Sequence, residues 1–177
     1  GVHEPAIQAL VEQQIRPGDV VYDVGAHIGY YALLSAKQMA GTGRVIAYEP
    51  EPASRALLQR NVDANGVAST VEVRNVALGE SSGRGTLLSF AHSGEATLQE
   101  GDGDVEVTTL DAEVYERGLP RPTVVIIDTE GMEAPIFRGG ERTLREARPR
   151  IICEHHNRSA EIDAVLEPLG YQGQTVD

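Results

Sequence analysis

The sequence has little cysteine and no long apolar run. Its one cysteine, Cys153, cannot form an internal disulfide or a thiolate metal cluster, and its apolar neighbours indicate a small buried side chain. No stretch approaches the roughly 20 apolar residues that span a bilayer, and the first residues show no charged start followed by an apolar run. These absences predict a cytoplasmic protein that does not interact with membranes.

Basic residues are also scarce. Lys37 is the only lysine, and 15 basic against 27 acidic residues give a formal net charge of −12. Such a surface repels phosphate backbones, and no run of lysine and arginine offsets this, so we expect no nucleic-acid partner. A length of 177 residues with 41% hydrophobic content predicts one domain over residues 1–177.

Short apolar runs alternate with helical periodicities along the chain. This alternation predicts an α/β fold, a Rossmann-like, doubly wound and mostly parallel sheet covered by helices on both faces. The predicted strands are residues 19–24, 44–48, 70–76, 123–127 and 150–153. The predicted helices are residues 5–14, 28–39, 53–64, 132–144 and 162–169.

Residues 80–103 break this rhythm because they contain five glycines and lack helical periodicity. We expect a hairpin insertion at residues 80–109, between the third and fourth core strands, whose own strands are 86–90 and 105–109. At the other end, residues 1–18 form an N-terminal helical segment that stops at Pro17 and Gly18.

A glycine-rich turn follows the first predicted strand. It reads Asp23-Val24-Gly25-Ala26-His27-Ile28-Gly29, and the second strand ends in Glu49, an acid placed to accept hydrogen bonds from ribose hydroxyls. The third glycine of a dinucleotide fingerprint is missing, and a carboxylate at Asp23 would repel a pyrophosphate. A cofactor with a sulfonium and an ammonium would instead be attracted, so the turn favours S-adenosylmethionine over NAD.

At this point the sequence resembles the FkbM-type family of class I S-adenosylmethionine-dependent methyltransferases. The resemblance covers nearly the whole chain, and its specificity comes from the order and spacing of several blocks. These blocks are DVGAHIGYYALLSAK at 23–37, GRVIAYEPEP at 43–52, NVALG at 75–79, VTTLD at 107–111, IIDTEGMEAPIFRGG at 126–140 and RPRIICEHH at 148–156.

The resemblance implies roles for individual residues. Asp23, Gly25 and Gly29 would shape the methionine side of the cofactor pocket, Glu49 would bind the ribose, and residues 75–77 would flank the adenine. The full expected cofactor-binding set is Asp23, Gly25, His27, Gly29, Glu49, Pro50, Asn75, Val76, Ala77 and Asp128. The resemblance also implies O-methylation of a sugar, a glycan or a secondary-metabolite hydroxyl, although the fold itself does not determine the acceptor.

Polar residues follow the fourth and fifth predicted strands. Asp128 and Glu130 should share one side of the chain, as should Glu154 and His156, because side chains alternate along a strand. Adjacent strand ends form the ligand crevice of an open parallel sheet, so we expect these four groups to act on the acceptor. The alternative is that Glu130 only caps the next helix and that the histidines lie in a solvated loop.

For the chemistry, His156 is the predicted general base, because its ordinary pKa suits proton transfer near neutral pH. A Mg²⁺ or Mn²⁺ ion held by the carboxylates is a less favoured alternative, and no metal ligand is assigned. N-methylation, an NAD-dependent oxidoreductase and a non-catalytic cofactor-binding protein of the same fold also remain open. The sequence does not reveal the acceptor or the oligomeric state.

Overall fold

The computed structural model describes residues 5–89, 96–155 and 158–175. Its main feature is a five-stranded sheet in the order β3-β2-β1-β8-β9, in which all neighbouring strands are parallel. The strands are β1 (Val20–Val24), β2 (Arg44–Tyr48), β3 (Val71–Arg74), β8 (Val124–Ile127) and β9 (Arg150–Cys153). The predicted doubly wound fold is therefore confirmed, because strand order reverses between β1 and β8.

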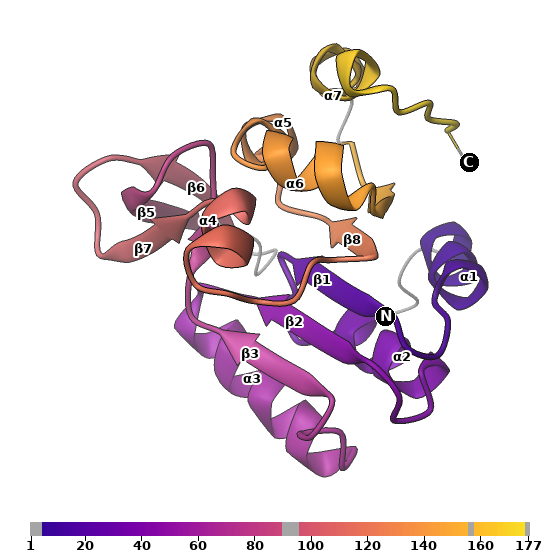
Figure 1. Cartoon of the computed structure of the whole chain (residues 1–177). Coiled ribbons are helices and arrows are strands. Elements are labelled where there is room, and N and C mark those ends of the chain that lie inside the picture. The colour runs from indigo at the N-terminus through magenta and orange to yellow at the C-terminus, as the bar shows by residue number, and fades with distance from the viewer. Residues whose placement is uncertain (1–4, 90–95, 156–157, 176–177) are drawn as a thin grey trace.

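Helices cover both faces of this sheet (Figure 1). One face packs against α1 (Pro5–Gln14), α2 (Tyr30–Gln38) and α3 (Pro52–Ala64). The other packs against α4 (Leu110–Tyr115), α5 (Glu133–Arg138), α6 (Glu141–Ala147), α7 (Ser159–Leu166) and the 3₁₀ turn η1 (Glu167–Leu169). The strands are short and apolar because both of their faces are buried. Among the described helices, none is long and apolar enough to cross a membrane.

Local sequence explains where α3 begins. Pro52 occupies its first turn, where the missing N–H costs nothing, and the carboxylate of Glu51 accepts hydrogen bonds from the N–H groups of Ala53 and Ser54. Because Glu51 lies two residues after Glu49, this cap fixes the chain directly beyond the end of β2.

The inserted segment differs from the predicted hairpin. It forms a second sheet in the order β4-β7-β5-β6, from β4 (Ala77–Leu78), β5 (Gly83–Ser89), β6 (Ala96–Glu100) and β7 (Val105–Thr108). β5 pairs antiparallel with β6 along most of its length and reaches β7 only through residues 83–85, so the expected pairing of 86–90 with 105–109 is wrong. Phe90 lies outside the described residues. Figure 1 shows the second sheet on the side of the first where β2 and β3 end.

Two further expectations are corrected. The third strand stops at Arg74 instead of residue 76, because the chain then leaves for the second sheet at β4. The single helix expected over 132–144 is split into α5 and α6 at Gly139 and Gly140. A Cβ on Gly139 would lie 2.2 Å from the carbonyl oxygen of Gly79, so this break lets the backbone pass closely against the end of β4.

The short helix α4 was not expected from the sequence. Thr109 caps it by accepting a hydrogen bond from the N–H of Ala112. In turn, Asp111 of α4 accepts hydrogen bonds from the N–H groups of Arg142 and Thr143 at the start of α6. α6 has no side-chain cap of its own at Gly140, so α4 supplies that cap from a distant part of the chain.

Candidate functional site

The carboxyl ends of β2, β1, β8 and β9 meet at one level of the sheet. Val24 is paired with both Tyr48 and Ile127, and Ile127 is paired with Cys153. The residues that come next in the chain are therefore side by side, and they are Gly25, Glu49, Asp128 and Glu154. The hydrogen bonds continue past the strands, with Asp128 N donating to Val24 O at 3.0 Å and Glu154 N to Ile127 O at 3.0 Å. Four predicted site residues thus share one edge.

Gly25 makes the close contact between the turn after β1 and the end of β8. Its φ is +81°, a conformation that side chains rarely adopt, and a Cβ built on it would lie 1.9 Å from the backbone oxygen of Asp128. Both facts require glycine. The predicted tight turn is therefore also the point where the two central strand ends touch.

Glu49 holds this turn in place. It is buried, and its Oε2 accepts a hydrogen bond from His27 N at 2.8 Å while Oε1 accepts one from Glu51 N at 2.7 Å. Burial raises the pKa of Glu49, and the two N–H groups oppose that rise. Both carboxylate oxygens of Glu49 already accept a backbone hydrogen bond. A ribose hydroxyl would therefore donate to the remaining lone pair of one of these oxygens. The sequence did not indicate this clamping role.

The other residues of the turn contact the end of β2 and the helix α3. His27 is exposed, has a left-handed φ of 49° and donates its N–H to Glu49. Gly29 precedes α2 with φ +92°, and a Cβ there would lie 2.3 Å from Cδ1 of Leu58 in α3. The turn is thus fitted between β2 and α3.

Asp23 is a buried carboxylate, and one of its oxygens is left without a hydrogen bond from the described residues. It is 2% exposed, and this oxygen is its Oδ2. Burial raises the pKa of Asp23 to about 7, the N–H of Ala32 opposes the rise, and the Glu49 carboxyl adds to it. A carboxylate in this state favours a cationic partner. The ammonium and sulfonium of S-adenosylmethionine fit this requirement, and a pyrophosphate does not.

The predicted adenine side follows β3. Asn75 is exposed, whereas Val76 and Ala77 are buried as the chain crosses from β3 to β4. This crossing is tied to the same edge because Glu49 N donates to the carbonyl oxygen of Arg74 at 3.1 Å. Pro50 is half-buried, and its carbonyl oxygen accepts a hydrogen bond from Arg55 at 2.7 Å.

The acceptor side consists of the segments after β8 and β9. Asp128, Glu130 and Glu154 are all half-buried, and each interacts with other groups. Glu130 has a φ of 52°, so the chain turns sharply after Asp128 and does not stay extended as expected. His156, the predicted general base, lies outside the described residues. The structure therefore brings three of the four predicted acceptor-side residues to adjacent strand ends.

Glu133 is a site-forming residue that sequence reasoning missed. It is 1% exposed, and its Oε1 accepts hydrogen bonds from Thr129 N at 3.2 Å, Thr129 Oγ1 at 3.0 Å and Gly131 N at 3.1 Å. The carboxylate that fixes this turn thus belongs to Glu133, in the first turn of α5, and not to Glu130 as the capping alternative supposed. The available signal was an acid four residues after Thr129 at a helix start.

Carboxylates gathered at one edge of a sheet are also ligands that Mg²⁺ prefers. Over the ranges that the structure describes, no three histidine, cysteine, aspartate or glutamate side chains are arranged to hold a metal ion. The hydrogen bonds that Glu49 and Glu133 accept from the backbone instead give these two buried acids a role in shaping turns.

Comparisons with known proteins identify the family to which this sequence is similar. The Methyltransferase FkbM domain matches residues 23–172, which include every described residue of the candidate site. Hexuronic acid methyltransferase AglP of Haloferax volcanii is 28% identical over 159 aligned positions, covering 86% of this chain and 62% of that protein. The 31-O-demethyl-FK506 methyltransferase FkbM of Streptomyces tacrolimicus is 26% identical and covers 92% of this chain and 75% of that protein.

A solved structure shares the fold. The crystal structure of methyltransferase FkbM from Methylobacillus flagellatus superimposes with a TM-score of 0.63 at 20% identity, over 92% of this chain and 43% of that chain. This chain therefore spans less than half of the crystallised protein and less than two thirds of the Haloferax relative.

Proposed function

Because the chain belongs to the FkbM methyltransferase family, we propose that it transfers a methyl group from S-adenosylmethionine to a hydroxyl oxygen of a small molecule or glycan. The observation that carries this proposal is the buried Asp23 beside the glycine turn, whose Oδ2 has no hydrogen-bond partner among the described residues. Asp23 is paired with Ala47 and Ile126, two residues before Glu49 and Asp128, and a cationic cofactor bound at this edge of the sheet would satisfy that oxygen.

The donor half of the site would be formed by β1, β2 and β3. When bound, the cofactor supplies an electrophilic methyl group on a positively charged sulfur. Asp23 would face the charged methionine end, Glu49 the ribose, and Asn75, Val76 and Ala77 the adenine. The turn from Gly25 to Gly29 would let the backbone approach the ligand closely, since Gly25 already allows contact with Asp128.

The acceptor half would be formed by the segments after β8 and β9. There Asp128, Glu130 and Glu154 would orient the acceptor hydroxyl and take up its proton, with His156 as the predicted base. Positioning alone supplies several kcal/mol in such displacements, roughly 7–11 kcal/mol at the upper end. The hydrogen bonds from Thr129 and Gly131 to Glu133 would preserve this arrangement before the acceptor binds.

The names of the relatives support an oxygen-rich acceptor. One acts on hexuronic acid and the other on 31-O-demethyl-FK506. The segment after β8 reads Asp-Thr-Glu-Gly in place of the Asn-Pro-Pro-Tyr type of motif that grips a planar amine, so transfer to nitrogen is disfavoured.

Titration of the purified protein with S-adenosylhomocysteine tests the proposal. Calorimetry should show one-site binding, and saturating ligand should raise the melting temperature because it binds only the folded state. NADH is the matched comparison and should do neither. A shift with NADH and none with S-adenosylhomocysteine would replace the methyltransferase proposal with the oxidoreductase alternative.

Turnover separates an enzyme from a cofactor-binding protein. A panel of hydroxylated sugars and metabolites, incubated with S-adenosylmethionine carrying a labelled methyl group, should yield a labelled product. Cofactor binding without label transfer to any member of the panel would favour the non-catalytic alternative.

A further inference from the structure

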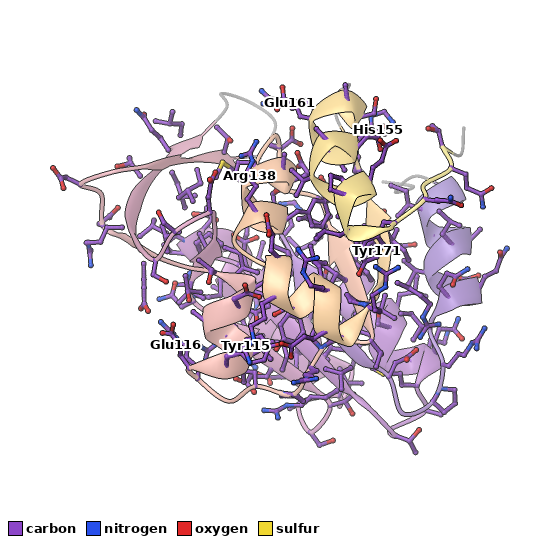
Figure 2. The ribbon with its side chains drawn as sticks, turned by 45° about the horizontal axis from the view of Figure 1, so that its top comes forward. Tyr115, Glu116, Arg138, His155, Glu161 and Tyr171 are labelled. Carbon is purple, nitrogen blue, oxygen red and sulfur yellow. The ribbon has the colours of Figure 1, made fainter. Side chains whose placement is uncertain are left out.

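An arginine lies against the acidic turn on the acceptor side. Arg158 immediately precedes α7, five residues after the end of β9. A Cβ built on Gly131 would lie 3.3 Å from Cζ of Arg158 and 3.4 Å from both Nε and Nη2. Three guanidinium atoms at nearly equal distance mean that the flat face of the group covers Gly131. Figure 2 shows Glu161, the next charged residue along the chain, near the same end of α7.

The surroundings of Arg158 belong to the candidate site. Gly131 ends the turn that contains Asp128 and Glu130, and its φ of +106° excludes most side chains. Any side chain at Gly131 would also press on the guanidinium. The turn therefore holds the cation at the edge where the strand ends of β8 and β9 meet.

The guanidinium of Arg158 also has N–H donors that remain available for a ligand. Its side chain is 51% exposed, and its ion pair with Glu161 joins Nη1 to Oε2 at 3.8 Å, which is too long for a hydrogen bond. A guanidinium has five N–H donors in a planar fork that matches the two oxygens of a carboxylate. Gly131 covers only the flat face of the guanidinium. The N–H groups point outward in the plane of the group, so they remain available to a ligand.

We propose that Arg158 binds the carboxylate of the acceptor, so that the acceptors are small hydroxylated carboxylic acids. This inference rests on the proposed methyltransferase function and specifies its substrate class. Asp128, Glu130 and Glu154 carry the wrong charge to admit an anion, and Arg158 offsets their repulsion at one position beside them. The acceptor is thereby oriented, with its carboxylate on Arg158 and a hydroxyl toward the strand ends.

The test compares matched probes on the S-adenosylhomocysteine complex. The anionic probes are the methyl glycosides of glucuronate and galacturonate and 3-hydroxybenzoate. The neutral partners are the methyl glycosides of glucose and galactose and 3-hydroxybenzyl alcohol. Calorimetry should show at least one anionic probe binding tenfold or more tightly than its neutral partner. Arg158→Gln should remove that preference while leaving S-adenosylhomocysteine affinity within twofold, and Arg158→Lys should restore only part of it.

Arg142→Gln is the matched control, because Arg142 is an exposed arginine of α6 that pairs with Glu146 away from the strand ends. It should retain the full preference. If the parent complex prefers no anionic probe, or if Arg158→Gln keeps the preference, the assignment of Arg158 is wrong. Failure of S-adenosylhomocysteine itself to bind would contradict the proposed function instead, so the two failures are distinguishable.

Discussion

Two buried acids at the strand ends differ in what their oxygens bind. Glu49 accepts a hydrogen bond from a backbone N–H group on each carboxylate oxygen and so fixes the turn after β1. Asp23 is also buried, but its Oδ2 receives no hydrogen bond from the described residues. Glu49 thereby stabilises the turn, whereas Asp23 is poised to meet a charged ligand.

Cofactor affinity should therefore depend on pH through Asp23. Its folded-state pKa is about 7, against an ordinary value of 3.8, so the ligand-free protein holds this proton below neutrality. The ammonium of S-adenosylhomocysteine favours the ionised form, and binding must release the proton. Affinity should rise by up to about tenfold per pH unit between roughly pH 5.5 and 7 and then level off. Calorimetry in buffers of different ionisation enthalpy measures the proton released.

Asp23→Asn is the control for this prediction. It should bind S-adenosylhomocysteine more weakly at pH 8 and should lose most of the pH dependence; any remaining slope then belongs to Glu49, whose pKa is also raised. The stability of the ligand-free protein changes with pH in the opposite direction. The raised pKa contributes stability at low pH that is lost as pH rises from about 4 to 7. An unchanged slope in Asp23→Asn would assign the proton to another group.

At the scale of elements, the turns and the short helix α4 hold the strand ends together. The turn after β1 touches the end of β8 at Gly25. α4 is joined to β2 and β3 through the fully buried Glu113, which pairs with Arg74 at 3.2 Å and accepts a hydrogen bond from Tyr48 at 3.2 Å. Glu113 also pairs with Arg117, just after α4, at 3.3 Å. Both connections link segments that are distant in the sequence.

Gly25→Ala should destabilise the protein far more than a comparable change at Gly66. Both glycines have positive φ, +81° and +67°, but a Cβ on Gly66 meets nothing within 4 Å. Gly66→Ala should cost only about 1–2 kcal/mol for the left-handed conformation. Gly25→Ala should cost about 2 kcal/mol more through its clash with Asp128 and should abolish S-adenosylhomocysteine binding. Urea unfolding and calorimetry measure the two effects, and equal costs at both positions would contradict the close approach.

Glu113→Gln should lower the free energy of unfolding by about 2–3 kcal/mol, because it removes the charge that the two arginines share. The partial exposure of Arg74 and Arg117 keeps this cost below that of a fully buried pair. Glu146→Gln is the matched control, since Glu146 pairs with Arg121 and Arg142 on the surface. Its urea midpoint should stay close to that of the parent protein. Similar shifts in the two variants would argue against a buried network.

At the scale of the whole molecule, the reversal of strand order divides the site into two halves. The chain runs from β1 outward to β2 and β3, passes through the second sheet and α4, and returns to β8 beside β1. Donor and acceptor groups therefore come from opposite sides of one switch point. This division predicts that variants in the two halves separate binding from turnover.

Asp128→Asn should lower the methylation rate constant on a verified acceptor while leaving S-adenosylhomocysteine affinity within a few-fold. Asp128 lies on the acceptor side of Gly25, and an interaction made mainly in the transition state affects turnover more than cofactor binding. Quenched time-course assays measure the rate constant, and calorimetry on the same preparation measures the affinity for S-adenosylhomocysteine. Parental turnover in this variant would remove Asp128 from the mechanism.

The sequence by itself determined the fold class, the strand positions and the shared level of the site acids. Strands β1, β2, β8 and β9 lie within one residue of their predicted limits, because a strand buried on both faces requires a short apolar run that is visible in the sequence. Parallel strands also bring their carboxyl ends to one edge, so residues that follow strand ends could be grouped before any distance was known.

Only the tertiary structure decided which partners these residues have. The roles of Glu49 and Glu133 depend on N–H groups presented by folded turns, and the break between α5 and α6 depends on the approach of Gly139 to Gly79. The contact of Arg158 with Gly131 joins residues 27 positions apart. Periodicity and motifs report local preference, whereas these contacts arise from the packing of distant segments, which no local pattern encodes.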